Sequence, residues 1–345
     1  MISVVIPVCN EKDSLQTLHE ELNSVAAKHG LTMEVIFVDD GSCDGSWDII
    51  KKLTAGGDSV TGIRFRRNFG KAAGLSAGFQ STRGDIVLTM DADLQDDPAE
   101  IPRFLEALRQ GGPGNTPLDV VSGWKKVRHD PWHKVLPSRV FNWLVGWMTS
   151  VRLHDHNCGM KCYRAEVLQE IRLYGELHRF IPVLAAARGF RVGEIEINHR
   201  ARRFGSSKYG VQRFVKGFLD LLTVKFITCY GQRPQHLLGS LGLLSFLVGG
   251  CGMFYLLITW ILRLWYPESF DPLHQRPLVI YSLAALLLGS QFMTVGFLAE
   301  LITAFRSKEE DYFSVAERVG AAAKQPSANA GTSSFPSRAR HDNTP

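Results

Sequence analysis

The sequence predicts an α/β fold with a doubly wound, mostly parallel sheet, followed by a pair of membrane-spanning helices. Short runs rich in valine and isoleucine alternate with helical segments through the first 125 residues, as in sheets covered by helices on both faces. Two long apolar segments follow between residues 237 and 299, and neither contains Asp, Glu, Lys or Arg. Each exceeds the roughly 20 residues that cross a bilayer.

Five predicted strands come first. Each is short and almost continuously apolar, which is typical of strands buried on both faces of a sheet. We expect these strands at Ile2–Val8, Met33–Asp39, Val60–Phe65, Asp85–Asp91 and Leu118–Ser122.

Four helices are expected between or after these strands. The first ends at Gly30, because glycine readily takes the left-handed conformation that closes a helix. The last begins at Pro98, and proline is favoured in the first turn of a helix. The predicted helices are Asp13–His29, Ser46–Leu53, Lys71–Ser81 and Pro98–Arg109.

Residues 126–230 are less regular and contain two amphipathic stretches. Pro131–Val151 carries several tryptophans among basic residues, and Val211–Tyr230 combines apolar residues with lysines. Tryptophan beside basic residues on an apolar helix indicates a position at a membrane surface. Ordinary core helices explain each stretch equally well, so both interpretations stay open.

The two apolar segments, Leu237–Leu262 and Leu278–Ala299, predict a transmembrane hairpin. The polar segment Arg263–Pro277 joins them, so the chain returns to its starting side. Basic residues are slightly more numerous on that side than in the connecting loop, and the first residues do not resemble a secretory signal peptide. We therefore expect the α/β domain to face the cytoplasm.

These patterns divide the chain into four expected parts. Residues 1–210 form the α/β domain, 211–235 an interfacial helix, 236–306 the hairpin and 307–345 a cytoplasmic tail. The tail turns to Ala, Ser, Pro and Asn from residue 320, a composition typical of disorder.

Composition limits the classes of partner. The formal net charge of +5 is mildly basic, which suits phosphates or acidic lipid headgroups and does not single out nucleic acid. The six cysteines form no zinc-binding pattern, so we interpret them as reduced thiols in the cytoplasm.

The strongest chemical signal is the acidic segment that follows the fourth strand. Asp91 and Asp93 stand one residue apart, and Gln95 adds a neutral oxygen. Carboxylate and amide oxygens at a strand end can bind Mg²⁺ or Mn²⁺, with a nucleotide diphosphate completing the shell. The alternative is a solvated acidic turn in which Asp96 or Asp97 caps the next helix.

The first two strands also end in polar residues. Pro7, Asn10 and Glu11 follow the first strand, and Asp39 and Asp40 follow the second. Acidic groups at such strand ends can accept hydrogen bonds from a base or ribose. Asp-Asp-Gly-Ser is also a competent turn and helix cap, so a purely structural role is the alternative.

Several of these segments together resemble one family. Val5–Glu11, Val38–Ser42 and Asp91–Asp96 look like the inverting family-2 glycosyltransferases of the GT-A fold. Arg67–Lys71 and Arg203–Tyr209 narrow the resemblance to polyprenyl-phosphate glycosyltransferases, similar to dolichol-phosphate mannose and glucose synthases. Two departures stand out: Cys9 replaces a usual aromatic residue, and Trp124-Lys125 replaces a frequent Ser-Arg.

The resemblance implies a role for each matching residue. Asp91, Asp93 and Gln95 would hold the metal and diphosphate, with Asp93 also counted as catalytic. Asp155 would orient or deprotonate the acceptor phosphate, ahead of His154 and His156. The nucleotide sugar would be held by Pro7, Asn10, Glu11, Asp39, Asp40, Asp91, Ala92 and Lys125, and the phosphates of donor and acceptor by Lys125, Arg202, Arg203, Ser207 and Lys208.

The implied reaction is a single displacement that inverts the anomeric centre. The donor would be GDP-mannose, UDP-glucose or a UDP-N-acetylhexosamine, and the acceptor undecaprenyl or dolichyl phosphate. A basic face near acidic lipids is the alternative for residues 200–203. Glycines at 239, 242, 249 and 250 permit close helix contacts, so copies of the chain are a further expected partner.

Other functions compete with this interpretation. A processive polysaccharide synthase would carry a Gln-x-x-Arg-Trp motif and more spans, and the sequence has neither. A transferase for a glycan or protein acceptor would not explain Arg67–Lys71 together with Ser207–Tyr209. A catalytically silent scaffold that binds nucleotide sugars would not need Asp91, Asp93 and Asp155.

Overall fold

The structure of the protein is a computed structural model that describes residues 1–57, 59–126, 132–171, 173, 177–200, 212–230, 233–267 and 271–306. The expected disorder of the tail, and the motif from 203 to 209, lie outside the described residues.

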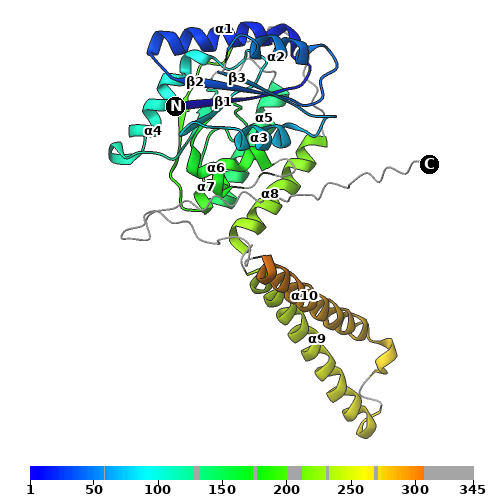
Figure 1. Cartoon of the computed structure of the whole chain (residues 1–345). Coiled ribbons are helices and arrows are strands. Elements are labelled where there is room, and N and C mark those ends of the chain that lie inside the picture. The colour runs from blue at the N-terminus through cyan, green and yellow to red at the C-terminus, as the bar shows by residue number, and fades with distance from the viewer. Residues whose placement is uncertain are drawn as a thin grey trace, which may run out of the picture. The chain divides into compact units, whose positions relative to one another are not determined.

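A seven-stranded mixed sheet forms the centre of the α/β domain (Figure 1). Its order is β3-β2-β1-β4-β6-β5-β7, and β1 pairs in parallel with both β2 and β4. Only β6 runs antiparallel to its neighbours among these strands. The strands are β1 (Ile2–Val8), β2 (Met33–Asp39), β3 (Val60–Arg64), β4 (Ile86–Thr89), β5 (Val120–Trp124), β6 (Lys161–Arg164) and β7 (Val192–Glu196).

The strand directions determine where a site can form. Because the other six strands are parallel, their carboxyl ends meet at one edge of the sheet, and β6 begins at that edge. Ligands of open α/β sheets bind beyond such carboxyl ends. The residues that follow β1, β2, β4, β5 and β7, and those that precede β6, therefore share one neighbourhood.

Helices cover both faces of the sheet (Figure 1). On one face, Leu18, Ile50 and Phe104 from three helices pack on alternate strand residues such as Phe37. On the other face, Leu75 packs with strand residues in a second cluster. The first face carries α1 (Lys12–His29), α2 (Ser46–Thr54) and α4 (Ile101–Gln110), and the second α3 (Lys71–Gln80), α6 (Ala165–Glu170) and α7 (Ile181–Ala187).

Helices α5 (Trp132–Thr149) and α8 (Gln212–Tyr230) pack against each other and against α7. Val145 and Leu221 are fully buried in this contact. On the outer side of α5, Trp143 and Trp147 are 68% and 72% exposed, and their rings stack with centroids 6.4 Å apart. Each of the two expected amphipathic stretches is thus a helix that buries apolar side chains on one side and exposes apolar side chains on the other.

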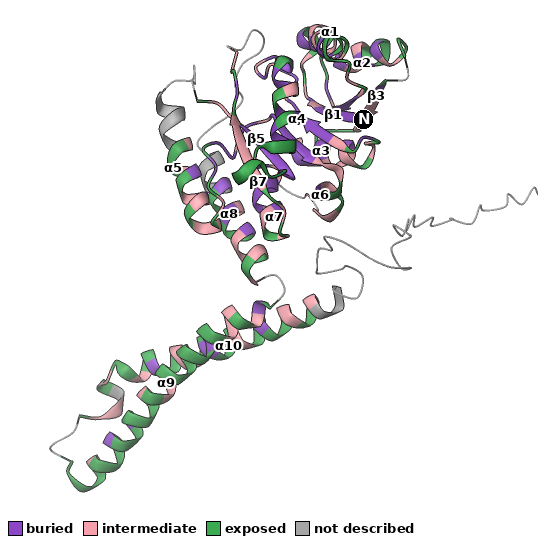
Figure 2. Ribbon diagram, turned by 90° about the vertical axis from the view of Figure 1, so that its left-hand side faces the viewer, coloured by how far each residue is buried: buried purple, intermediate pink, exposed green. Residues whose placement is uncertain are grey.

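Helices α9 (Pro234–Trp265) and α10 (Leu278–Arg306) form an antiparallel hairpin. Both are long and apolar enough to cross a membrane, and most of their side chains are exposed (Figure 2). A Cβ at Gly242 would meet Met293 Cγ at 2.7 Å, and one at Gly249 would meet Ser282 O at 2.7 Å. These glycines therefore let α9 and α10 approach each other within one chain.

The expected elements of residues 1–125 are confirmed, with ends that differ by up to three residues. The prediction for Pro98–Arg109 is divided: residues 98–100 form a 3₁₀ turn and α4 follows. Asp97 caps this start, since its carboxylate accepts from Ala99 N at 2.9 Å. Strands β6 and β7 and helices α6 and α7 were not predicted. All six cysteines are free.

Candidate functional site

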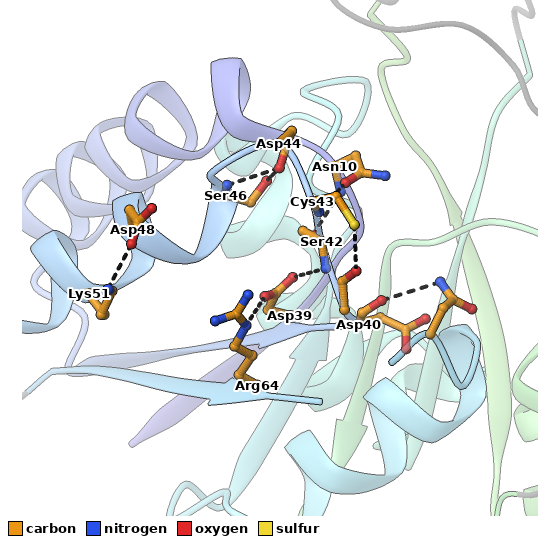
Figure 3. Close-up of polar contacts among 12 residues, drawn as sticks. Asn10, Asp39, Asp40, Ser42, Cys43, Asp44, Ser46, Asp48, Lys51 and Arg64 are labelled. Atoms are coloured by element: carbon orange, nitrogen blue, oxygen red, sulfur yellow. Dashed lines mark hydrogen bonds and ion pairs between the residues drawn. The ribbon is translucent and has the colours of Figure 1, made fainter. Parts of the chain in front are cut away.

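The loops after β1 and β2 are joined by hydrogen bonds at the sheet edge (Figure 3). Asn10 takes a left-handed backbone conformation with a φ of 57°. Its backbone N donates to Ser42 Oγ at 2.9 Å, and its side-chain Oδ1 accepts from Cys43 N at 2.9 Å. Glu11 N donates to Ser46 Oγ at 3.1 Å. These bonds bring Asn10 and Glu11 beside the residues that follow β2.

Asp39 is fully buried at the end of β2. Its Oδ1 accepts from Ser42 N at 3.0 Å, and its Oδ2 lies 3.4 Å from Arg64 Nε at the end of β3 (Figure 3). The carboxylate thus shapes the turn and links two strand ends. Its expected contact with a nucleotide stays a prediction.

Asp40 has a different set of partners. Its Oδ1 accepts from Phe69 N at 2.6 Å, and its Oδ2 accepts from Gly70 N at 2.9 Å. A Cβ at Gly41 would lie 2.6 Å from the backbone of Arg67, so only glycine lets this loop approach. Asp40 therefore fixes the loop that leads into α3.

Asp91 and Asp93 follow β4 as expected. The Asp91 carboxylate forms an ion pair with Lys71 Nζ, and a Cβ at Gly159 would lie 2.5 Å from its Oδ2. Burial opposes the charge of Asp91, but Lys71, together with Lys125 and Lys161, outweighs burial and lowers the pKa of Asp91 to about 2. Asp93 is 7% exposed, and its Oδ1 accepts from Gln95 N at 3.2 Å. The turn thus presents two neighbouring carboxylates.

Two carboxylates alone would not complete a metal site. Among the described residues, no group of three or more His, Cys, Asp or Glu side chains is arranged to hold a metal ion. Hard divalent cations take six or more oxygen ligands. Any cation at Asp91 and Asp93 would therefore need oxygens from a bound ligand or water.

Lys125, at the end of β5, lies against the same turn. Its Nζ is 2.8 Å from Oδ1 of the fully buried Asp96. Burial disfavours the ammonium, but the neighbouring acidic groups, Asp96 foremost, together outweigh burial and raise the pKa of Lys125. Lys125 thus keeps its charge close to Asp91, while its expected contact with donor or acceptor phosphate stays a prediction.

Asp155 lies at the same edge, before β6, and is 2% exposed. Its Oδ1 accepts from Asn157 N at 3.1 Å. His154 instead lies at the surface, where its ring stacks on Trp124 at 4.1 Å and contacts Glu194. His156 is buried, and burial followed by the charge of Lys161 lowers the pKa of His156 to about 4.

Basic residues that the sequence did not single out also lie here. Lys161 opens β6, is 4% exposed and donates from Nζ to the Cys158 carbonyl. Burial, then the positive charges of Lys71 and Arg179, lower the pKa of His178 to about 2. Because strand β6 was not predicted, no strand-end signal marked Lys161 in the sequence.

The chain after β7 returns to the acidic turn. Arg200 N donates to Gln95 O at 2.9 Å, and its Nη2 lies 2.7 Å from Asp97 Oδ1. The structure therefore brings the sequence up to residue 200 beside the turn. The predicted phosphate-binding residues Arg202, Arg203, Ser207 and Lys208 lie outside the described residues.

Residues 3–172 match the profile of glycosyl transferase family 2. A dodecaprenyl-phosphate galacturonate synthase of Rhizobium johnstonii is 37% identical over 307 residues, which cover 87% of each chain. This chain belongs to glycosyl transferase family 2. It is a glycosyltransferase, and the predicted resemblance to polyprenyl-phosphate glycosyltransferases is confirmed.

A second relative has a different sugar in its name. An undecaprenyl-phosphate 4-deoxy-4-formamido-L-arabinose transferase of Aeromonas hydrophila is 33% identical over 303 residues, which cover 88% of each chain. The two relatives thus share a polyprenyl phosphate in their names and differ in the sugar.

Solved structures support the fold. Glucosyl-3-phosphoglycerate synthase of Mycobacterium tuberculosis, in complex with Mn²⁺, UDP and phosphoglyceric acid, has a TM-score of 0.50 and 18% identity. The match covers 67% of this chain and 78% of that one. The predicted GT-A arrangement, a mostly parallel sheet covered by helices, is therefore confirmed.

Proposed function

We propose that this glycosyltransferase transfers a sugar from a nucleotide-sugar donor to a polyprenyl phosphate, with inversion at the anomeric carbon. The main observation behind the proposal is that Asp91, Asp93 and Asp155 lie close to lysines at one edge of the sheet. Support for the acceptor comes from relatives that are 37% and 33% identical over most of both chains and are named for polyprenyl phosphates.

Asp91, Asp93 and Gln95 would hold Mg²⁺ or Mn²⁺ together with the donor diphosphate. Two observations fit such a cation: the Lys71 ammonium already stands beside Asp91, and Gly159 leaves space for the carboxylate where a Cβ would not. When bound, the metal would supply positive charge that stabilises the departing nucleoside diphosphate. Lys125, which Asp96 holds next to the turn, would add a second positive charge near the departing diphosphate.

Asp155 would position the attacking group. A phosphate monoester is mostly dianionic near neutral pH, since its second pKa is about 6, so it needs little deprotonation. A buried carboxylate fixed by Asn157 N is suited to orient the acceptor rather than to act as a strong base. One displacement by the acceptor oxygen then inverts the anomeric centre.

The part of this sheet edge formed by the ends of β1 and β2 would bind the nucleotide. Pro7, Asn10 and Glu11 lie at the end of β1, and Ser42 connects this loop to β2. Asp39, Asp40 and the backbone at Ala92 lie on neighbouring strand ends. We assign the base and ribose to this side because the diphosphate is assigned to Asp91 and Asp93.

The hairpin would anchor the enzyme in the bilayer with the α/β domain in the cytoplasm. Lys225, Arg233 and Arg306 flank the hairpin on the domain side, against Arg263 and Arg276 at the other end. We keep the division into a catalytic domain (1–210), an interfacial helix (211–235), a hairpin (236–306) and a tail (307–345). Trp143 and Trp147 would then lie at the membrane surface.

The test is a transfer assay with the purified full-length protein, polyprenyl phosphate and Mg²⁺ or Mn²⁺. Each radiolabelled donor is supplied in turn, and label is followed into the organic phase. The panel holds GDP-mannose, UDP-glucose and UDP-N-acetylhexosamines, together with nucleotide-linked galacturonic acid and 4-formamido-arabinose, the sugars in the relatives' names.

We expect a metal-dependent lipid product that Asp93→Ala abolishes. Product from only one donor would identify the sugar. If donor hydrolysis occurs without lipid product, the acceptor assignment is wrong and a glycan or protein acceptor takes its place. If nucleotide binds and no donor is consumed, the chain is a scaffold for nucleotide sugars.

A further inference from the structure

The segment Arg67–Lys71 connects β3 to α3, and Lys71 is the first residue of that helix. The Lys71 ammonium forms an ion pair with the carboxylate of Asp91, 20 residues further along the chain. The segment therefore reaches from the β2 end of the site to the carboxylate assigned to the metal.

The backbone of this segment is firmly held. Both carboxylate oxygens of Asp40 accept its backbone N–H groups, at Phe69 and at Gly70. Asn68 Nδ2 also donates to the Asp40 carbonyl at 3.3 Å. Asp40 is 4% exposed, so water weakens these bonds little. The Cα of Lys71 is thus fixed while its long side chain, 31% exposed, has room to turn.

Lys71 and a divalent cation would compete for one position. Lys71 Nζ contacts Asp91 Oδ1, and the Gly159 backbone lies beside the same carboxylate, where an added Cβ would clash with both of its oxygens. An ammonium and a metal ion repel each other at contact distance, so each weakens the binding of the other to the same carboxylate oxygen. A cation that binds Oδ1 of Asp91 would therefore tend to displace Lys71.

A bound donor would change this competition. The nucleoside diphosphate carries negative charge and offers phosphate oxygens, which are ligands for a divalent cation and acceptors for an ammonium. Its arrival would supply the oxygens that the two carboxylates lack and a new partner for the displaced Lys71. Without a donor, displacement would separate the Lys71 ammonium from the Asp91 carboxylate with no diphosphate to receive it.

We propose that Lys71 is an internal competitor for the divalent cation at Asp91, so that the metal binds well only together with the nucleotide-sugar donor. This inference rests on the proposed function, in which Asp91 and Asp93 hold the metal. Without a donor, the Lys71 ammonium occupies the cation position at Asp91. With a donor bound, the same ammonium would contact and position the diphosphate. The consequence is an enzyme that binds the metal weakly in the absence of donor.

The experiment measures Mn²⁺ affinity of the full-length protein in detergent, by electron paramagnetic resonance of free Mn²⁺. Titrations are made with Mn²⁺ alone and then with UDP or GDP present. Lys71→Met removes the charge and keeps the chain length, and Lys71→Arg keeps the charge. We expect Lys71→Met to bind Mn²⁺ alone about tenfold more tightly than the natural protein, since a competing charge is lost.

Lys71→Arg should bind Mn²⁺ alone as weakly as the natural protein does. With nucleoside diphosphate present, the advantage of Lys71→Met should disappear, because the variant lacks the new contact. The matched control is Lys51→Met, which removes an exposed lysine paired with Asp48 on α2 and should change neither titration. Circular dichroism checks folding, and Lys71→Gln is the second neutral variant if Lys71→Met is misfolded.

Two outcomes would overturn the inference. If the neutral variants bind Mn²⁺ alone no more tightly than the natural protein, Lys71 does not compete for the cation. If Lys71→Arg behaves like Lys71→Met, the effect is steric. By contrast, no Mn²⁺ binding in any variant, even with nucleotide, would reject the metal assignment in the proposed function itself.

Discussion

The backbone N–H of Gly70 donates a 2.9 Å hydrogen bond to Oδ2 of Asp40, so the end of β2 fixes the start of α3. Carboxylates stabilise the first turn of a helix because its N–H groups lack partners within the helix. Here the carboxylate comes from a distant strand. It therefore links the acidic residues after β2 to Lys71 and, through Lys71, to Asp91.

We predict that Asp40→Ala acts through this loop. Loss of a helix-capping carboxylate should lower the free energy of unfolding by about 1–2 kcal/mol. A displaced Lys71 should also let Mn²⁺ alone bind more tightly, as in Lys71→Met. Thermal unfolding and Mn²⁺ titration measure the two effects. The double variant Asp40→Ala/Lys71→Met should bind Mn²⁺ no more tightly than either single variant, because both substitutions remove the Lys71 ammonium from Asp91.

An opposite result would favour the direct role of Asp40 in nucleotide binding. In that case Asp40→Ala would weaken UDP or GDP binding and leave the affinity for Mn²⁺ alone unchanged. Asp48→Ala is the control, since Asp48 is an exposed carboxylate on α2 whose partner is Lys51.

We predict that Gly159→Ala impairs catalysis. The added Cβ would lie 2.5 Å from Asp91 Oδ2, so the carboxylate must move. A displacement of about 1 Å at a reacting centre lowers kcat on the order of 100-fold. Steady-state transfer kinetics check this effect. Gly74→Ala, where the added Cβ meets Pro7 at an ordinary 3.5 Å, should retain activity; equal losses in both variants would contradict the prediction.

We predict that His156 makes the fold sensitive to acid. The pKa of His156 is lowered from 6.5 to about 4 in the folded protein, so the unfolded chain binds more protons between these values. The contribution of uncharged His156 to the free energy of unfolding is fully present above pH 6.5 and is lost as pH falls towards 4. The contribution is about 3 kcal/mol, because each tenfold difference in proton affinity between the folded and unfolded chain corresponds to about 1.4 kcal/mol.

The measurement compares thermal unfolding of the natural protein and His156→Asn in detergent, at pH 7.5 and 4.5. The natural protein should lose more stability than the variant over this interval. His29→Asn, at an exposed position, should behave like the natural protein. Parallel losses in the natural protein and His156→Asn would show that His156 does not contribute.

We predict that neighbouring glycines in α9 differ in importance. An alanine Cβ at Gly249 would lie 2.7 Å from Ser282 O, whereas one at Gly250 would meet nothing within 4 Å. Gly249→Ala should destabilise the hairpin by about 1–3 kcal/mol because the helices must separate. Gly250→Ala should be neutral. Thermal unfolding in detergent compares the two, and equal midpoints would contradict the predicted packing.

Gly242 and Gly249 bear on the expected association between copies. Both contact α10 of the same chain, so these two glycines are already used within the hairpin. Association of copies stays a hypothesis. The mass of the detergent-solubilised protein, measured for the natural chain and for Gly250→Leu, tests whether the open side of α9 contributes.

The sequence by itself determined the elements whose signals are local. Unbroken apolar runs predicted β1 to β5, because strands buried on both faces need no polar residues. Gly30 marked the end of α1, where it takes a φ of 61°, and Pro98 marked the start before α4. The uncharged segments predicted the hairpin for the same reason: length and apolarity are properties of one segment.

The tertiary structure decided what depends on distant pairs. Strand β6 has four residues and lies between β4 and β5 in the opposite direction, which no local pattern reveals. The partners of the predicted acids also lie far away in sequence: Asp40 with Gly70, Asp91 with Lys71 and Gly159, and Asp96 with Lys125. Sequence placed carboxylates at strand ends, but only the folded chain brings each one its hydrogen-bond or ion-pair partner.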